Sequence, residues 1–221
     1  MRRIVAGVFQ SLDGVIQGPG GPTEDYTGGF QHGGWLPPLD DDAVGETIGK
    51  LFEGEFDLLL GRKTYDIFAA YWPYAPEGDP IGGPFDKAAK YVVTRGDAPL
   101  PWQNSHRLAT IDAVAELKAG DGPDLVIQGS ASLYPPLLAA GLIDRLTLMT
   151  FPLVLGTGKR LFGQGTPAFT LKPIAQKISA KGTIIATYEP AGEVETGTFI
   201  GPDPSDREKA RQAKMKQEDD W

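Results

Sequence analysis

Short, continuous apolar runs constrain the fold of this chain more than any other feature. They occupy residues 4–9, 56–60, 91–94 and 125–128. A strand that is apolar along its whole length is typical of a parallel sheet with helices on both faces, because a half-exposed strand would alternate apolar and polar residues. The runs therefore predict an α/β fold with a mostly parallel central sheet.

Helical patterns and turn signals lie between these runs. We expect helices over residues 42–53, 62–70, 111–119 and 132–140, and a further strand over residues 142–149. The pattern changes near the end of the chain, where residues 169–178 and 183–188 flank a Ser-Ala-Lys-Gly turn and predict a closing antiparallel hairpin. Residues 193–200 are expected to add an edge strand.

Length and composition predict one domain followed by a tail. A chain of 221 residues can bury a core of ample size in a single domain, which we place at residues 1–200. Residues 201–221 contain few apolar side chains and many mixed charges. We expect them to form a charged tail with one exposed helix beginning at Ser205.

Charge and residue usage exclude several classes of function. Lys and Arg total 21 and Asp and Glu total 29, which gives a formal net charge of −8, whereas nucleic-acid binding needs a broad basic surface. The chain has no cysteine, and its two histidines, His32 and His106, lie far apart, so we expect no disulfide, no thiolate nucleophile and no metal site. No apolar stretch reaches the length of a membrane-spanning helix, and we expect a cytoplasmic protein without a membrane partner.

Small and basic residues follow three of the predicted strands, at the points where ligands bind to parallel α/β sheets. They are Gly61, Arg62, Lys63 and Thr64 after the second run, Thr94 and Arg95 after the third, and Gly129, Ser130 and Ala131 after the fourth. Glycine allows a ligand to approach closely, a helix start presents free N–H groups, and Arg, Lys and Thr donate hydrogen bonds to phosphate. Together these residues predict a dinucleotide cradle whose 2′-phosphate pocket favours NADPH over NADH.

Four motifs occur in the order found in the superfamily of dihydrofolate reductase and the RibD C-terminal reductase domain, and the chain resembles that superfamily. They are SLDGVI at residues 11–16, LGRKTY at 60–65 with YWP at 71–73, GSASL at 129–133, and GLIDRL at 141–146 leading into PLVLGTGKRLF at 152–162. The resemblance covers residues 3–189. It implies a dihydrofolate-reductase-like fold, NADPH as cofactor, a homodimer, and an activity similar to the 5-amino-6-(5-phosphoribosylamino)uracil reductase of riboflavin biosynthesis.

The resemblance also implies roles for individual residues. The backbone of Ala6 would face the nicotinamide carboxamide, and the loop at residues 12–16 would close over the nicotinamide as a lid. Asp13 and Trp35 would lie on the substrate side. The implied cofactor contacts are Ala6, Gly14, Ile16, Gly61, Arg62, Lys63, Thr64, Thr94, Arg95, Gly129, Ser130, Ala131 and Leu133.

The chain departs from reductases of the riboflavin pathway at three positions. Those enzymes typically carry a lysine where this chain has Gly7, a glutamate where it has Gln128, and two glycines where it has Gly129 and Ser130. A glutamine can hydrogen-bond but cannot exchange a proton at neutral pH. Gln128 is a candidate catalytic residue, and the identity of the substrate is left open.

A buried carboxylate is the feature that a dihydrofolate reductase would need instead. Asp40, Asp41 and Asp42 lie near the start of the helix that follows the substrate loop, and Asp42 is the candidate that would orient a pterin and support its protonation. The alternative is that these aspartates cap the helix and interact with its dipole.

The segment at residues 18–38 is long for a compact domain and contains many glycines, prolines and aromatic residues. A segment of this kind is either functional or disordered, so we expect a lid over the substrate pocket or a mobile surface excursion. The expected activity is hydride transfer from NADPH to a C=N or C=O carbon of a small substrate. Three alternatives are a dihydrofolate reductase, a non-catalytic nucleotide-binding module of the same fold, and a flavin-binding reductase.

Overall fold

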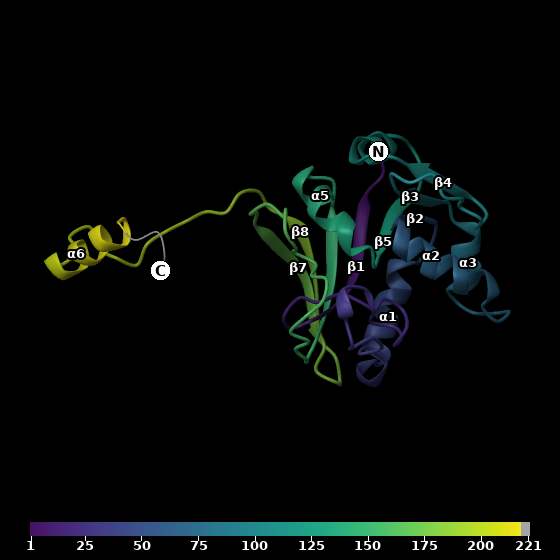
Figure 1. Ribbon diagram of the computed structural model, residues 1–221, viewed down its shortest axis with the longest axis horizontal. Coiled ribbons are helices and arrows are strands. Elements are labelled where there is room, and N and C mark those ends of the chain that lie inside the picture. The colour runs from purple at the N-terminus through teal and green to yellow at the C-terminus, as the bar shows by residue number, and fades with distance from the viewer. Residues whose placement is uncertain (218–221) are drawn as a thin grey trace.

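The computed structural model describes residues 1–217, and its centre is an eight-stranded sheet (Figure 1). The strands are β1 (Ile4–Ser11), β2 (Phe56–Gly61), β3 (Lys90–Val93), β4 (Ser105–Leu108), β5 (Asp124–Gln128), β6 (Arg145–Phe151), β7 (Leu171–Ile178) and β8 (Ile184–Pro190). Their order across the sheet is β4-β3-β2-β5-β1-β6-β8-β7. The end of the predicted tail, residues 218–221, lies outside the described residues.

The pairings confirm the predicted α/β architecture. Strands β1 to β6 all run parallel, whereas β8 pairs antiparallel with both β6 and β7. The sheet is therefore mostly parallel and closes with a C-terminal antiparallel hairpin. Because β5 lies between β1 and β2, the carboxyl ends of these three strands are neighbours at one edge of the sheet.

Helices cover both faces of the sheet (Figure 1). They are α1 (Asp42–Leu51), α2 (Arg62–Tyr71), α3 (Gly82–Lys87), α4 (Ile111–Ala119), α5 (Tyr134–Ala139) and α6 (Asp206–Met215), with short 3-10 turns at Thr27–Gly29, Pro37–Leu39, Trp72–Tyr74 and Ala131–Leu133. Polar side chains cap three of the helices: Asp41 accepts from the N–H of Val44, and Thr110 and Ser205 begin α4 and α6.

The central strand β1 is buried on both faces, which explains its continuous apolar sequence. Ala6 and Val8 pack with the buried residues of α4 and α5. Val5 points the other way and packs with Tyr65 of α2 and Phe85 of α3. A fully buried side chain of this kind stabilises the fold by about 1.5–3 kcal/mol relative to exposure, so both helix layers hold the sheet.

The sequence-based prediction of an edge strand at residues 193–200 is wrong. The hairpin ladder ends where Thr170 N donates to Gly192 O, and the chain then leaves the sheet as an exposed, irregular segment. Figure 1 shows this segment leading away from the domain to α6, which contains no buried residue. The chain turns away from the outermost strand β7, so the segment has no strand to pair with.

Two elements have no counterpart in the sequence-based prediction. Strand β4 is a half-exposed edge strand, and α3 is a six-residue helix held by the burial of Phe85. The strand expected at 142–149 runs from Arg145 to Phe151 instead, and Asp144 just before it accepts a hydrogen bond from Ile4 N at 2.7 Å.

The β7–β8 hairpin exposes apolar side chains. Ile174, Ile178 and Ile184 are all exposed. A homodimer that covers this surface stays a prediction. Among residues 1–217, no helix has both the length and the apolar character required to cross a bilayer.

Gly7 in β1 lies directly under α1. A Cβ built at Gly7 would overlap Cδ2 of Leu51, and Ile48 lies behind it with Cδ1 at 3.9 Å. No larger side chain therefore fits at this position while Leu51 keeps its place.

Replacing Gly7 with alanine is expected to lower the free energy of unfolding by about 1–3 kcal/mol, because the added methyl overpacks the contact with Leu51. The variant Leu51→Ala provides the space, so the double variant should lose less stability than the sum of the two single variants. Urea unfolding of all four proteins measures this coupling, and additive losses would contradict the proposed contact.

Candidate active site

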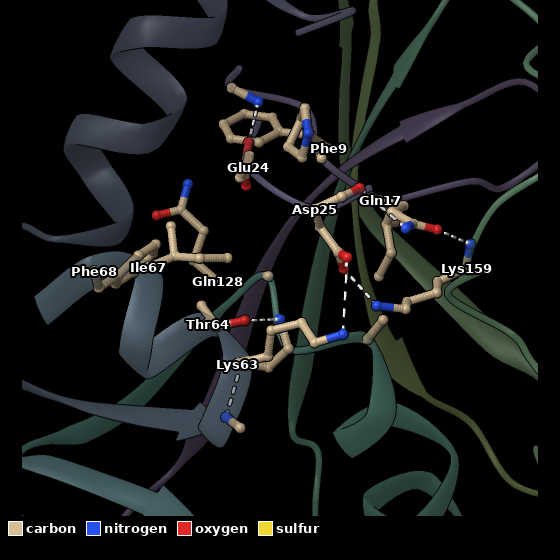
Figure 2. Close-up of a pocket in the computed structure, with 18 of the residues that line it drawn as sticks. Phe9, Gln17, Glu24, Asp25, Lys63, Thr64, Ile67, Phe68, Gln128 and Lys159 are labelled. Atoms are coloured by element: carbon tan, nitrogen blue, oxygen red, sulfur yellow. Dashed lines mark hydrogen bonds and ion pairs between the residues drawn. The ribbon is translucent and has the colours of Figure 1, made fainter. Parts of the chain in front are cut away.

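A cavity of about 640 Å³ lies at the carboxyl ends of β1, β2 and β5 (Figure 2). Phe9, Gly61 and Gln128 contribute from the three strand ends, α2 forms one wall, and the segment after β1 forms another. The cavity is lined by Phe9, Ile16, Gln17, Gly18, Pro19, Gly20, Gly21, Glu24, Asp25, Leu36, Gly61, Lys63, Thr64, Ile67, Phe68, Tyr71, Trp72, Gln128, Gly129, Ser130, Ala131, Ser132 and Lys159. This is the place where parallel α/β sheets bind their ligands.

The structure brings together only part of the predicted site. The predicted residues that line the cavity are Ile16, Gly61, Lys63, Thr64, Gln128, Gly129, Ser130 and Ala131. The predicted residues outside its lining are Ala6, Asp13, Gly14, Trp35, Asp42, Arg62, Thr94, Arg95 and Leu133.

The turns that follow β2 and β5 are bonded to each other. Gly61 N donates to Ser130 Oγ at 2.9 Å, and Ser130 N donates to Thr64 Oγ1 at 2.9 Å. Ser130 adopts a left-handed conformation with φ of 59°, which is costly for a residue with a side chain. Its hydroxyl satisfies a buried backbone N–H, and that hydrogen bond offsets the conformational cost.

The turn after β5 contributes a residue without a side chain, Gly129, to the cavity lining. Gly129 has φ of 69°, and a Cβ at this position would lie 3.1 Å from Thr64 Cγ2, so a side chain would fill the space between the two turns. The adjoining helix α2 begins at Gly61 without a side-chain cap. Its first-turn N–H groups leave about half a positive charge at this end, which attracts an anion.

A second group of predicted residues gathers beside the cavity. Gly61 is the β-sheet partner of Val93, so Arg62 and Thr94 follow neighbouring strand ends. The Arg62 guanidinium contacts both Asp66 oxygens at 2.9 Å and Ala98 O at 2.8 Å. This hydrogen bond with Asp66 raises the pKa of Arg62, which stays charged.

Ala6, Gly14 and Leu133 occupy interior or turn positions. Ala6 lies in the middle of β1 between its partners Ile127 and Leu146, and Leu133 is buried in the same cluster. Gly14 has φ of 78°, and its N–H donates to Ser11 O at 2.9 Å in a tight turn. These three residues therefore have structural positions outside the cavity lining.

Asp13 joins the loop after β1 to the loop after β6. Its carboxylate accepts from Leu155 N at 3.1 Å and from Gly156 N at 2.9 Å, and Ser11 Oγ donates to it at 2.6 Å. The Ser11 hydrogen bond contributes most to lowering the pKa of Asp13 to about 2, with the two backbone N–H groups adding to it against the effect of burial. Asp13 is therefore an ionised anchor between two loops.

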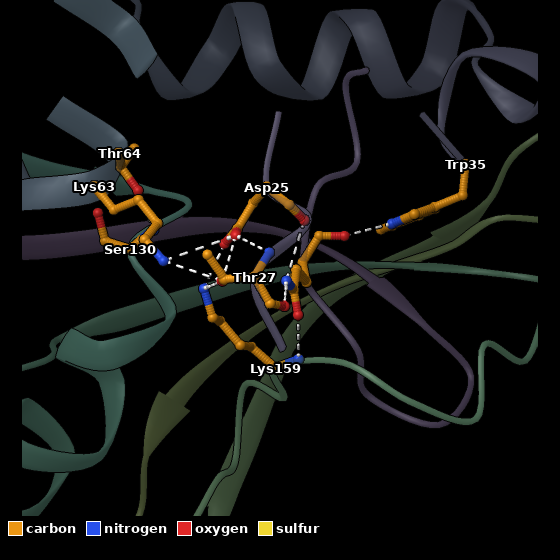
Figure 3. Close-up of polar contacts among 8 residues, drawn as sticks. Asp25, Thr27, Trp35, Lys63, Thr64, Ser130 and Lys159 are labelled. Atoms are coloured by element: carbon orange, nitrogen blue, oxygen red, sulfur yellow. Dashed lines mark hydrogen bonds and ion pairs between the residues drawn. The ribbon is translucent and has the colours of Figure 1, made fainter. Parts of the chain in front are cut away.

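The segment at residues 18–38 is held against the domain by Gln17 and Trp35. Trp35 is buried, packs edge-on against Phe151, and donates from Nε1 to Gln17 O at 2.9 Å. The buried Gln17 side chain donates to Asp25 O at 3.1 Å and to Thr27 O at 2.9 Å. These contacts hold the turn at Asp25, a residue of the cavity lining, and Figure 3 shows Asp25, Thr27 and Trp35 in this network.

The same segment brings two carboxylates, Glu24 and Asp25, into the cavity lining, where Asp25 meets Lys159 of the loop after β6. Lys159 donates from Nζ to Asp25 and to Thr27 Oγ1, the latter at 3.0 Å. Burial raises the pKa of Asp25, but the hydrogen bonds from Lys159 and Thr27 outweigh burial and hold it at about 2.

Glu24 differs, because burial raises its pKa more than the N–H groups of Gly20 and Gly21 lower it. The sequence-based prediction missed Gln17, Glu24, Asp25 and Lys159. The length and composition of the 18–38 segment pointed only to Glu24 and Asp25, and Lys159 lies in the motif at residues 152–162 without having been assigned a role.

The chain matches the family model of the RibD C-terminal domain over residues 2–184. It belongs to the RibD C-terminal domain family. A relative, the uncharacterized protein YyaP of Bacillus subtilis strain 168, is 28% identical over 195 residues, which cover 85% of this chain and 94% of the relative.

Solved structures show the same fold as this RibD C-terminal domain. A putative riboflavin biosynthesis protein from Shewanella sp. PV-4 matches with a TM-score of 0.63 at 22% identity, covering 86% of this chain and 99% of its own. A pyrimidine reductase-like protein from Corynebacterium diphtheriae matches with a TM-score of 0.59 at 16% identity, covering 87% and 93%. Dihydrofolate reductase from Enterococcus faecalis, in a complex with NADP(H), matches with a TM-score of 0.53 at 17% identity, covering 85% and 96%. The dihydrofolate-reductase-like fold is therefore confirmed.

Within this family the position of Gly7 has a steric explanation. A lysine there would require the Leu51 side chain of α1 to move, because its Cδ2 takes the space next to the Gly7 Cα. Gln128, the β-sheet partner of Gly7, does line the cavity. Asp42 is exposed in the first turn of α1, outside the cavity lining, and Asp41 caps that helix.

The Ser130 turn gives a matched pair of variants. Ser130→Ala leaves Gly61 N without its acceptor and keeps the left-handed strain, so we expect it to destabilise the protein by about 1–3 kcal/mol. Ser130→Gly loses the same bond but relieves the strain, by about 1–2 kcal/mol, and should be the milder variant. Urea unfolding ranks the two, and an alanine variant as stable as the wild type would contradict the assigned role.

Proposed function

We propose that this RibD C-terminal domain protein is an NADPH-dependent reductase that delivers a hydride to a C=N or C=O carbon of a small heterocyclic or ribosyl-amine substrate. The observation that carries the proposal is the cavity, where three parallel strand ends, a bare glycine turn and an uncapped helix start meet. Family membership supports a reductase of this fold.

The residues around the cavity fit a nicotinamide dinucleotide. Gly129 lines the cavity without a side chain, so a diphosphate could lie against its backbone, and Lys63, Thr64 and the α2 N–H groups would donate to it. Arg62, Thr94 and Arg95 lie at the ends of β2 and β3, where they would bind the adenosine and its 2′-phosphate. These donors favour NADPH over NADH.

The remaining space suits a small planar substrate. Phe9, Ile67, Phe68 and Leu36 give the cavity apolar surface, and Gln128 offers an amide that can orient a ring by hydrogen bonds (Figure 2). When bound, the cofactor supplies a hydride from C4 of its nicotinamide ring. The protein's part is to hold the two rings in contact and exclude water from them.

The atom next to the reduced carbon also needs a proton, and Glu24 is the residue we propose for it. Glu24 and Asp25 are the carboxylates in the described cavity lining. Asp25 is paired with Lys159 and has a pKa of about 2, so it carries no proton at neutral pH. The burial of Glu24 raises its pKa and increases its protonated fraction, which is what a general acid requires.

Saturating NADPH is expected to raise the melting temperature, because a ligand that binds only the folded state at a hundred times its Kd adds about 2.7 kcal/mol of stability. NADH should raise the melting temperature less than NADPH does. The variant Arg62→Gln should reduce the difference between the shifts that the two cofactors produce. Lys172→Gln on the exposed edge strand β7 is the matched control and should behave as wild type. NADPH oxidation with pterins, aminouracil ribotides and simple imines then tests turnover, and the absence of any NADPH-induced shift would overturn the proposed function.

A Glu24→Gln variant is expected to lower kcat by about a hundredfold, since general acid catalysis contributes at least that much. In the wild type the rate should fall as the pH rises through the pKa of Glu24, because the carboxyl must hold its proton to act. Raising that pKa shifts the fall toward neutral pH, and the variant should lack it. Glu77→Gln, at an exposed position outside the cavity, is the control, and a variant that keeps the wild-type pH profile would exclude Glu24 as the acid.

A further inference from the structure

A carboxylate of the 18–38 segment lies between two lysines at the edge of the cavity (Figure 3). Asp25 pairs with Lys159 through Oδ2, and its Oδ1 lies 3.8 Å from Lys63 Nζ. Thr27 Oγ1 completes the cluster, with Lys63 Nζ at 3.1 Å and Lys159 Nζ at 3.0 Å. The two lysines come from opposite sides of the cavity, one from α2 and one from the loop after β6.

The cluster is a built arrangement and not a chance surface contact. The side chain of Gln17, which is only 4% exposed as a residue, accepts from Lys159 N at 3.0 Å and donates to the backbone of Asp25 and Thr27. One buried amide therefore fixes both the loop that carries Lys159 and the turn that carries Asp25.

The charges in the cluster do not balance. Two lysines face one carboxylate, and the uncapped start of α2 adds further positive potential beside Lys63. Burial, and then the proximity of Lys159, lower the pKa of Lys63, as expected where positive charge is in excess. A pair of cations at a helix start suits an anion with more charge than one carboxylate, such as a phosphate or diphosphate.

We propose that Lys63 and Lys159 form the binding site for the diphosphate of the cofactor, and that Asp25 occupies this site as an internal substitute until the cofactor displaces it. The inference rests on the proposed function for the identity of the anion. It adds Lys159 to the residues that hold the cofactor and assigns Asp25 the role of a competitor carried by the protein itself.

The exchange has a structural consequence for the segment. Asp25 lies two residues before the 3-10 turn that begins at Thr27, and it is directly preceded by Glu24, which lines the cavity. Releasing the Asp25 carboxylate would remove its contacts with the two lysines and leave this turn held by Thr27 Oγ1 and Gln17, while Trp35 still anchors the far end of the segment to Gln17 O. Cofactor binding is thereby coupled to the position of the segment that covers the substrate space.

The decisive variant is Asp25→Asn, which keeps the shape of the side chain and removes its charge. Isothermal titration with inorganic pyrophosphate is expected to show about tenfold tighter binding than to the wild type, because a like charge a few ångströms from the anion has been removed. NADPH should bind more tightly by a similar factor. Asp112→Asn, an exposed aspartate in the first turn of α4, is the matched control and should leave both affinities unchanged.

A second pair of proteins tests Lys159 without the complication of its ion pair. Asp25→Asn/Lys159→Gln should bind pyrophosphate about tenfold more weakly than Asp25→Asn alone. Lys172→Gln in the Asp25→Asn background is the control. If the Lys159 change has no effect, Lys159 is not part of the anion site.

The outcomes separate this inference from the proposed function. Tighter pyrophosphate binding by Asp25→Asn, with no NADPH binding by either protein, would support the anion site and overturn the reductase proposal. NADPH binding that is unchanged or weakened by Asp25→Asn would leave the reductase proposal intact and overturn the exchange. Absence of pyrophosphate binding by both proteins would overturn the exchange as well.

Hydrogen–deuterium exchange on the wild-type protein tests the displacement even where a variant fails to fold. Saturating pyrophosphate is expected to speed amide exchange in the peptide that covers residues 22–28, since Thr27 N loses Asp25 Oδ1 as its acceptor. Unchanged or slower exchange in this peptide, with pyrophosphate bound, would show that Asp25 keeps its place.

Discussion

The cavity depends on the hydrogen bonds that join the turns after β2 and β5. Ser130 accepts from Gly61 N and donates to Thr64, so each turn satisfies polar groups of the other. These bonds hold the ends of two strands together, next to Gly129, which lines the cavity. A serine in a left-handed conformation is tolerated there because an unsatisfied buried N–H would cost about as much as the strain, 1–3 kcal/mol. Ser130 thus joins the two turns through its side chain and its backbone N–H, beside Gly129 in the cavity lining.

Much of the fold could be predicted from the sequence because the central strands are buried on both faces. Their continuous apolar sequences indicate this burial directly, and parallel pairing places the carboxyl ends of these strands at the same edge of the sheet. The edge strand β4 carries no such signal, since half of its side chains face solvent. The short helix α3 is specified by the packing of Phe85 and not by a helical pattern. Residues 193–200 show the opposite case, a strand-like sequence that has no partner because the chain leaves the sheet after its pairing with Thr170.

The candidate site could be predicted only where it is built from strand ends. Gly61 ends β2, and Lys63 and Gly129 lie just after β2 and β5. Parallel pairing places the carboxyl ends of these strands at one edge of the sheet, where the three residues line the cavity. Gln17, Asp25 and Lys159 reach the cavity through hydrogen bonds between segments about 140 residues apart in sequence. No sequence periodicity predicts contacts of this kind. The composition of residues 18–38 could therefore indicate a functional segment without showing which of its side chains face the cavity. The same reasoning applies to Gly7, whose lack of a side chain is explained by a leucine on a helix 44 residues later.

Glu24 and Asp25 show how one turn of the chain gives neighbouring carboxyls opposite properties. Both are partly buried, and burial raises the pKa of each. Asp25 meets the Lys159 ammonium and the Thr27 hydroxyl, which stabilise its charge and bring its pKa to about 2. Glu24 meets only the N–H groups of Gly20 and Gly21, which do not overcome the loss of water. Environments that move two carboxyl pKa values apart are how active sites separate an acid from a fixed anion. Under the proposed function, Asp25 is the ionised partner of Lys159, while Glu24 supplies the proton that hydride transfer to a polar double bond requires.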